Sequence, residues 1–492
     1  MKRSSGILFH ISSLPSPYGI GTLGKEAFAF IDFLKQAGQK YWQMLPLGPT
    51  GFGDSPYQSF SSFAGNPYFI DLDLLIDDGL LSKEEVCGIC WGKDSKRVDY
   101  EKIYQYREVV LKKAFQRGFK RDKELLGDFC HNNQDWILDY ALYMSLKSYF
   151  GMKSWEEWED QDIRFRSPKV LEKYQELLKE EIQYHIYIQY LFFQQWEALR
   201  AYGRAKGIRF IGDIPIYVPL DSADIWASPE FFQLDERRIP VAVGGVPPDC
   251  FSQTGQLWGN PLYNWEAMKS DDYSWWIQRI RACTKLFDAI RIDHFRGFES
   301  YWSIPWGEVT AVNGKWRPGP GHDFIQRMKE NFPSLEIIAE DLGFLTEEVR
   351  ELVTFSGFPG MKVLQFAFES KETCNYLPHN YNRNSVVYTG THDNTTAAGW
   401  LEEGNDTEIE FARKYMGLNR EEGWVWGFIR SGMSSVSDLF IAQMQDYLEL
   451  PGSERMNIPG TLGNNWKLRL EKGELTEELA NKIANITKMY GR

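Results

Sequence analysis

The sequence of 492 residues predicts an α/β fold, a barrel of eight parallel strands surrounded by helices. Short apolar segments alternate with amphipathic helical patterns, which favours a parallel sheet covered by helices. Eight such segments occur, the number that closes a barrel of this kind. Polar residues follow several of them directly, at the strand ends where such barrels carry their functional sites.

The predicted elements follow one another through the whole chain. The candidate strands are residues 6–10, 41–45, 208–213, 289–293, 336–340, 362–366, 386–389 and 439–443. The clearest helical patterns cover residues 25–37, 170–206, 273–286, 346–355 and 476–489. We therefore expect one elaborated barrel over residues 1–492.

Inserted subdomains are expected after strands 2, 3 and 4. Residues 67–168 follow the second strand and carry helical patterns at 100–115 and 134–150, so we expect a mainly helical insertion. Residues 221–270 follow the third strand and contain PVAVGGVPPDCFSQTGQLWGNPLY, rich in proline, glycine and aromatic residues. This composition indicates a long ordered loop, which we expect to form a lid over the site.

Composition and charge exclude several classes of partner. The net charge of −13 lacks the basic surface that binds nucleic acid, and it disfavours anionic lipid. No apolar run reaches the roughly 20 residues of a membrane helix, and MKRSSGILFH lacks the apolar core of a signal peptide. We expect a cytoplasmic protein without nucleic-acid or membrane partners.

The cysteines do not predict a metal or redox centre. There are six, and the CGIC at residues 87–90 has no second pair to complete a zinc site. A redox motif would need a thioredoxin-like context, which is missing. Sparse cysteines also fit a reducing compartment.

The stretch AIRIDHFRG at residues 289–297 places charge at the end of an apolar strand. Side chains alternate along a strand, so Arg291 and Asp293 share one face while Ile290 and Ile292 share the other. A neighbouring cation lowers the pKa of a carboxylate and keeps it ionised, which suits a nucleophile or a cation stabiliser. Taken alone, this segment slightly favours the alternative, a buried Arg–Asp ion pair with a purely structural role at the barrel rim.

The same pattern repeats at other strand ends. EIIAE ends in Glu340, SVVYTGTHDNTT leads to His392 and Asp393, and IRFIGDIPIYV carries Asp213. Converging carboxylates raise each other's pKa values, so one can stay ionised while a neighbour holds a proton. That pairing supplies a nucleophile and a general acid for glycoside chemistry. A divalent metal is the alternative, but Arg291 in the same mouth would compete with it.

Aromatic residues lie in or near the predicted strand-end loops. Flat rings rimmed by polar groups suit sugars, which offer C–H faces and hydroxyl edges. Packing within the loops is the alternative for each ring. The residues are Tyr57, Phe251, Trp258, Tyr263, Phe366 and Trp400.

Three motifs in order, RIDHFRG, AEDLG and THDNT, resemble the conserved segments of the α-amylase clan of glycosidases and glucan transferases. More narrowly, the chain resembles the 4-α-glucanotransferases, a family also called amylomaltases or disproportionating enzymes. The segments that carry this resemblance are LPLGPTGFGDSPYQSFSSFAGNPYFIDL, GDIPIYV, FSQTGQLWGNPLYNW and NIPGTLGNNW. It extends from ILFHISSLPSPYGIG to NNWKLRL, nearly the full chain.

The resemblance implies a (β/α)₈ TIM barrel with insertions and without a C-terminal β-domain. It implies retaining transfer of α-1,4-glucan segments from malto-oligosaccharides to the 4-hydroxyl of a glucan or glucose acceptor, through a covalent glucosyl-enzyme. No cofactor or metal is implied. The competing functions are an α-1,4-glucan hydrolase of the same clan and a glucan-binding scaffold without catalysis.

The resemblance also assigns residues by matched position. Asp293 would be the nucleophile, Glu340 the general acid/base and Asp393 the transition-state stabiliser. Many relatives carry an aromatic residue, usually tyrosine, where this chain has Cys250, so acceptor stacking there is expected to be weaker. The residues implied in substrate binding are Tyr57, Asp213, Trp258, Arg291, His294, His392 and Asn464.

Overall fold

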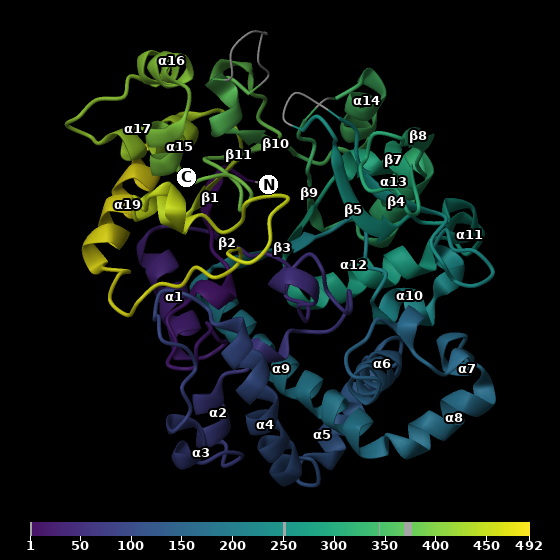
Figure 1. Cartoon of the computed structure of the whole chain (residues 1–492). Helices are drawn as coiled ribbons and strands as arrows, with labels where there is room; N and C mark the ends of the chain where they lie inside the picture. The colour runs from purple at the N-terminus through teal and green to yellow at the C-terminus, as the bar shows by residue number, and fades with distance from the viewer. Residues whose placement is uncertain (1, 249–251, 344, 369–375) are drawn as a thin grey trace.

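Eight parallel strands form a closed barrel in the order β1-β12-β11-β10-β9-β6-β3-β2 (Figure 1). The structure is a computed structural model and describes residues 2–248, 252–343, 345–368 and 376–492. It confirms the predicted barrel. The strands are β1 (Ser4–Leu8), β2 (Tyr41–Gln43), β3 (Arg209–Ile214), β6 (Ala289–Ile292), β9 (Glu336–Ala339), β10 (Gly360–Val363), β11 (Ser385–Tyr388) and β12 (Leu439–Gln443).

The barrel strands coincide with the predicted segments except at their ends. β1 starts two residues before the predicted 6–10, and β10 ends at Val363. Residues expected to continue β10 form the short 3-10 helix η7 (Leu364–Phe368). Because η7 is largely buried, its apolar residues look like a strand in the sequence.

Helices surround the barrel, and a helical region separates β2 from β3. The predicted helix over 170–206 is divided in two, because Leu178 leaves helical geometry at φ −105° and ψ 20°. The helices before β3 are α1 (Lys25–Gln36), α2 (Leu72–Asp77), α3 (Lys83–Cys87), α4 (Tyr100–Gly118), α5 (Lys123–Asn132), α6 (Ile137–Tyr149), α7 (Gln161–Arg164), α8 (Pro168–Leu177) and α9 (Lys179–Lys206). Those after β3 are α10 (Ala223–Ala227), α11 (Trp265–Ser270), α12 (Ser274–Leu286), α13 (Gly321–Asn331), α14 (Glu347–Ser356), α15 (Ala397–Glu403), α16 (Asp406–Met416), α17 (Trp424–Ser434), α18 (Met444–Tyr447) and α19 (Glu477–Met489).

A second, antiparallel sheet stands beside the barrel in the order β5-β4-β7-β8, at the right of Figure 1. Its strands are β4 (Ala242–Val246), β5 (Gln256–Pro261), β7 (Ser300–Pro305) and β8 (Lys315–Pro318). The segment interpreted as a loop therefore supplies two strands. Its glycines concealed them: a Cβ at Gly244 would lie 2.7 Å from the Tyr217 ring, so this strand position must be glycine.

The register of three neighbouring strands positions the site. In β3 and β6, Asp213 pairs with Arg291, and in β6 and β9, Arg291 pairs with Ile338. Continuing the second register by two residues brings Asp293 opposite Glu340 on the same face. Parallel strands thus carry these side chains to one mouth of the barrel. Within the described ranges, no helix has the length and apolar character to cross a membrane.

Candidate active site

Arg291 lies between two carboxylates at the carboxyl ends of β3 and β6. Its Nη1 contacts both carboxylate oxygens of Asp213 at 2.7 Å, and its Nη2 contacts Asp293 at 2.8 Å. Only 4 % of Arg291 is exposed, so the guanidinium needs both partners. These contacts hold Asp293 in a fixed orientation.

The pKa of Asp293 is shifted in the opposite direction to the sequence-based expectation. The prediction of a lowered pKa is wrong for the net shift: burial raises the pKa of Asp293, and the attraction of Arg291 only partly offsets it. The negative charges of Asp213 and Asp393 add to the rise. Arg291 is therefore needed to keep this carboxylate ionised beside its acidic neighbours.

Glu340 follows β9 and accepts two backbone hydrogen bonds. The N–H of His294 donates to Oε2 at 2.6 Å, and the N–H of Leu342 donates to Oε1 at 2.8 Å. Burial and the neighbouring Asp293 raise the pKa of Glu340 to about 7, while Arg291 and the two amides oppose the rise. This carboxyl group can give and take a proton near neutral pH.

Asp393 lies in the loop after β11 within a network of donors. Asn457 Nδ2 donates to its Oδ1 at 2.7 Å, and His392 Nε2 lies 3.3 Å from its Oδ2. Arg455 donates to its backbone carbonyl at 2.5 Å. Burial disfavours the charge, but His392, Asn457 and Arg291 outweigh it and hold the pKa of Asp393 well below its usual range. Asp393 therefore remains a fixed negative charge.

Tyr57 connects this loop to β3. Its hydroxyl donates to Asp213 at 2.8 Å and lies 3.3 Å from His392 Nδ1. The two rings are stacked with centroids 4.9 Å apart. Burial and the charge of Asp213 raise the pKa of Tyr57 well above its usual value, so the hydroxyl stays protonated.

Trp258 and His294 form the wall beside Glu340. Their rings meet edge to face with centroids 4.8 Å apart. Burial and the charge of Arg296 lower the pKa of His294 to about 3, so the imidazole is neutral. Trp258 belongs to β5, so the second sheet contributes directly to the mouth.

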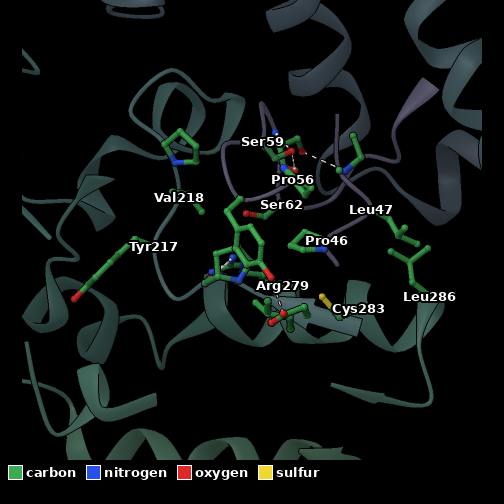
Figure 2. Close-up of a pocket in the computed structure, with 18 of the residues that line it drawn as sticks. Pro46, Leu47, Pro56, Ser59, Ser62, Tyr217, Val218, Arg279, Cys283 and Leu286 are labelled. Carbon is green, nitrogen blue, oxygen red and sulfur yellow. Dashed lines mark hydrogen bonds between the residues drawn. The ribbon is translucent and has the colours of Figure 1, made fainter. Parts of the chain in front are cut away.

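A small cavity of about 60 Å³ lies behind Tyr57 and Asp213. Figure 2 shows its walls, which come from the loops after β2 and β3 and from Arg279, Cys283 and Leu286 of α12. Ligand sites usually measure about 300–1,000 Å³, so this cavity does not hold a sugar chain. Substrate must approach Tyr57 from the barrel mouth.

The structure joins nine of the ten predicted site residues through the contacts above. Asn464 is the exception: it is exposed and lines a neighbouring hollow of about 1,030 Å³ together with Tyr104 and Arg455. Its role in glucan binding stays a prediction. The residues brought together are Tyr57, Asp213, Trp258, Arg291, Asp293, His294, Glu340, His392 and Asp393.

Of the aromatic residues expected near the strand-end loops, some lie at the site and others pack in the core. Tyr263 and Trp400 are buried, Tyr263 beside Trp275 and Trp276, which matches the packing alternative. Phe366 meets Tyr376 edge to face at 5.8 Å. Phe251 and Cys250 lie outside the described residues.

The metal alternative gains no support from the described part of the chain. There, no cluster of three or more histidine, cysteine or acidic side chains is arranged to hold an ion. Cys87 and Cys90 are exposed free thiols. Arg291 occupies the place among the acids that a cation would take.

Three residues of the mouth escaped the sequence analysis. Asn457 and Arg455 bind Asp393, and the Trp466 ring lies 5.9 Å from that of Tyr57. A signal existed, because the motif NIPGTLGNNW begins at Asn457 and contains Trp466. The sequence alone gave no reason to choose Asn457 over Asn464 within it.

Comparison with known proteins agrees with this geometry. A family model described as 4-alpha-glucanotransferase matches residues 9–476. The chain belongs to this family. It is 50 % identical over 485 residues to the 4-alpha-glucanotransferase of Clostridium butyricum, covering 98 % of this chain and 99 % of that one. With the chloroplastic/amyloplastic 4-alpha-glucanotransferase of Solanum tuberosum it shares 41 % identity over 100 % of this chain and 87 % of that one.

Solved structures of the family have the same fold. The amylomaltase from Streptococcus agalactiae in complex with acarbose aligns with a TM-score of 0.97 and 44 % identity over 100 % of both chains. The amylomaltase from Corynebacterium glutamicum shares only 18 % identity, with a TM-score of 0.79 over 99 % of this chain and 75 % of that one. The fold therefore persists when most residues differ. The family acts by transfer and not by hydrolysis.

Substitutions at Asn457 test the environment of Asp393. Asn457→Ala removes one hydrogen bond to a charged group and should lower kcat for glucan transfer about ten- to hundredfold. Asn457→Asp places a second carboxylate within hydrogen-bond distance and should lower kcat further, because like charges raise the pKa of Asp393. Steady-state kinetics of both variants measure this order. Equal and near-wild-type rates would show that Asp393 does not depend on Asn457.

Proposed function

We propose that this 4-alpha-glucanotransferase moves α-1,4-glucan segments by a retaining double displacement at Asp293 and Glu340. The observation that carries the proposal is the unequal environment of two neighbouring acids. Asp293 is paired with Arg291, whereas Glu340 accepts hydrogen bonds from the neutral amides of His294 and Leu342 and has a pKa of about 7. A proton shared by the pair therefore resides on Glu340.

In the first half-reaction, Glu340 donates its proton to the glycosidic oxygen. The carboxylate of Asp293 attacks the anomeric carbon, the glycosidic bond breaks, and the released fragment leaves with a free 4-hydroxyl. The product is a glucosyl ester of Asp293. Arg291 orients the attacking oxygen throughout, because it remains fixed to Asp213.

In the second half-reaction, the ionised Glu340 acts as a base. It takes the proton from the 4-hydroxyl of an acceptor glucan or glucose, whose oxygen attacks the anomeric carbon and displaces Asp293. Two inversions restore the α configuration. Glu340 ends protonated, ready for the next donor.

Strand geometry supports retention of configuration. Retaining enzymes hold their two carboxyl groups about 5–5.5 Å apart. Asp293 and Glu340 follow β6 and β9, which are paired neighbours, and parallel strands lie about 4.8 Å apart. Adjacent strands in this register deliver two side chains at nearly the required spacing.

Asp393 stabilises the positive charge that develops on the sugar ring in the transition state. Its low pKa keeps it ionised across the working pH range. His392 and Tyr57 flank the sugar at the cleaved bond, Trp258 and His294 line the wall beside Glu340, and Asn464 contacts the glucan further along. The site thus supplies two carboxylates, Asp293 after β6 and Asp393 in the loop after β11.

Preference for a sugar acceptor over water at roughly 55 M requires an oriented acceptor and a drier site. We assign that role to residues 221–270, which bring β5 and Trp258 to the mouth. Malto-oligosaccharides fit as substrates, and the acarbose complex of a relative supports a glucan ligand. An acidic chain with free cysteines fits a cytoplasmic setting without nucleic-acid or membrane partners.

Incubation with maltotriose tests the transfer reaction. We expect glucose and longer oligomers to appear while the total number of reducing ends stays constant, since each transfer breaks one bond and forms another. Chromatography of the products combined with a reducing-end assay measures both quantities. A steady rise in reducing ends without longer oligomers would identify a hydrolase instead.

The pH profile tests Glu340 as the acid. Because Glu340 must be protonated to donate a proton to the glycosidic oxygen, kcat/KM should fall as pH rises through about 7. Glu340→Gln cannot donate a proton and should lose about 10²–10⁴-fold in kcat together with this alkaline limb. Glu347→Gln, the same change on the exposed start of α14, is the control. Near-wild-type turnover in Glu340→Gln would contradict the assignment.

A further inference from the structure

His294, the residue directly after Asp293, has a left-handed backbone with φ 50° and ψ 48°. Residues other than glycine adopt this region uncommonly, because the Cβ crowds the backbone, although asparagine, aspartate and histidine do so more often than the rest. Such strain persists only where surrounding contacts impose it, and it concentrates at functional sites. The neighbours of His294 should therefore depend on this conformation.

Three consecutive amides around His294 attach the end of β6 to both neighbouring strands. The Asp293 N–H donates to the carbonyl of Ile214 in β3 at 2.9 Å. The His294 N–H donates to Glu340 Oε2 at 2.6 Å, and the Phe295 N–H donates to the Glu340 carbonyl at 3.0 Å. The two residues that follow Asp293, the proposed nucleophile, therefore both donate backbone hydrogen bonds to Glu340, the proposed acid/base.

The left-handed turn explains why two successive amides reach the same residue. In extended backbone, successive N–H groups point to opposite sides of the strand. A left-handed residue ends this alternation, as in the backbone nests whose successive N–H groups bind an anion. At His294 the first of the two amides binds the Glu340 carboxylate, whose other oxygen accepts from the Leu342 amide, and the Phe295 amide binds the Glu340 main-chain carbonyl.

We propose that His294 is a positioning residue whose left-handed backbone, independently of its imidazole ring, aligns Glu340 with Asp293 for both proton transfers. The proposal rests on the function above only in taking Glu340 as the acid/base. It gives the backbone of His294 a role separate from that of the imidazole ring. The ring meets Trp258 edge to face.

The charged groups facing Glu340 determine the sign of the expected effect. They are Asp293, whose charge raises the pKa of Glu340, and Arg291, which lowers it. Arg296 also interacts with Glu340 electrostatically and favours its ionised form. The His294 and Leu342 amides stabilise the carboxylate and lower the pKa. Loss of the His294 hydrogen bond therefore raises the pKa of Glu340 and moves the alkaline limb of kcat/KM to higher pH.

Two substitutions of similar size separate backbone from ring. His294→Asn and His294→Thr both remove the imidazole and its contact with Trp258. Asparagine tolerates the left-handed region, whereas a β-branched threonine is an outlier there. His294→Gly, which is free of the restriction, is a third variant that shows the effect of losing the ring alone.

The measurement is the pH dependence of kcat/KM for maltotriose transfer, with thermal unfolding of each variant as a folding control. We expect Asn and Gly variants to keep the wild-type alkaline limb while losing rate through the missing ring. In the Thr variant, the alkaline limb of kcat/KM should move to higher pH by about half a unit or more, and kcat should fall by about a further tenfold.

The same data can overturn the proposal. If Asn, Gly and Thr variants share one alkaline limb and one rate, His294 acts through its ring only. If the Thr variant fails to fold, the Gly and Asn variants still provide a test. Both can keep the left-handed backbone, so a shift of their alkaline limb to higher pH than in the wild type would refute a backbone role. Absence of transfer by the wild-type protein would instead refute the proposed function, so the two failures are distinct.

Discussion

The Arg291 guanidinium, shared between Asp213 and Asp293, is the interaction on which the barrel mouth depends. Four acidic side chains lie around this mouth, and burial raises the pKa values of Asp293 and Glu340. Arg291 is itself buried, and an unpaired buried cation is strongly unfavourable. Strand register places the buried cation beside the acids. Asp213 is the cross-strand partner of Arg291, and Asp293 lies two residues further along β6 on the same face. The resulting cluster keeps one acid ionised and leaves the proton to its neighbour.

Barrel strands hold some of the residues at the mouth, and loops hold the others. Asp213, Arg291, Asp293 and Glu340 are fixed by hydrogen-bonded barrel strands, which gives the reacting carboxyl groups a constant spacing. Asp393 depends instead on side chains from a distant loop, including Asn457, that approach from near the end of the chain. The proposed nucleophile and acid/base are thereby held at the ends of barrel strands, so the loops can change without moving them.

Sequence reasoning reached the barrel and the three central acids because both follow local rules. Alternation fixes which side chains share a face, and parallel topology brings strand ends together. It failed where long-range contacts decide the outcome. The net pKa of Asp293 depends on how burial compares with one ion pair, and Asn457 binds an acid 64 residues away in sequence. Likewise, the two glycines of β4 resemble a loop in the sequence, and only the structure shows that Tyr217 restricts Gly244 while Gln256 and Ile304 restrict Gly245. The left-handed backbone of His294 has no sequence signal at all.

Covalent trapping tests the central claim most directly. A fluorinated α-glucosyl fluoride forms the glucosyl-enzyme but slows its breakdown, so the intermediate accumulates and survives proteolysis. Peptide mass spectrometry should then find one added fluoroglucosyl group, esterified to Asp293 in the peptide that contains IDHF. A label on Glu340 or Asp393, or turnover of the reagent with retained configuration and no labelled Asp293, would contradict the account.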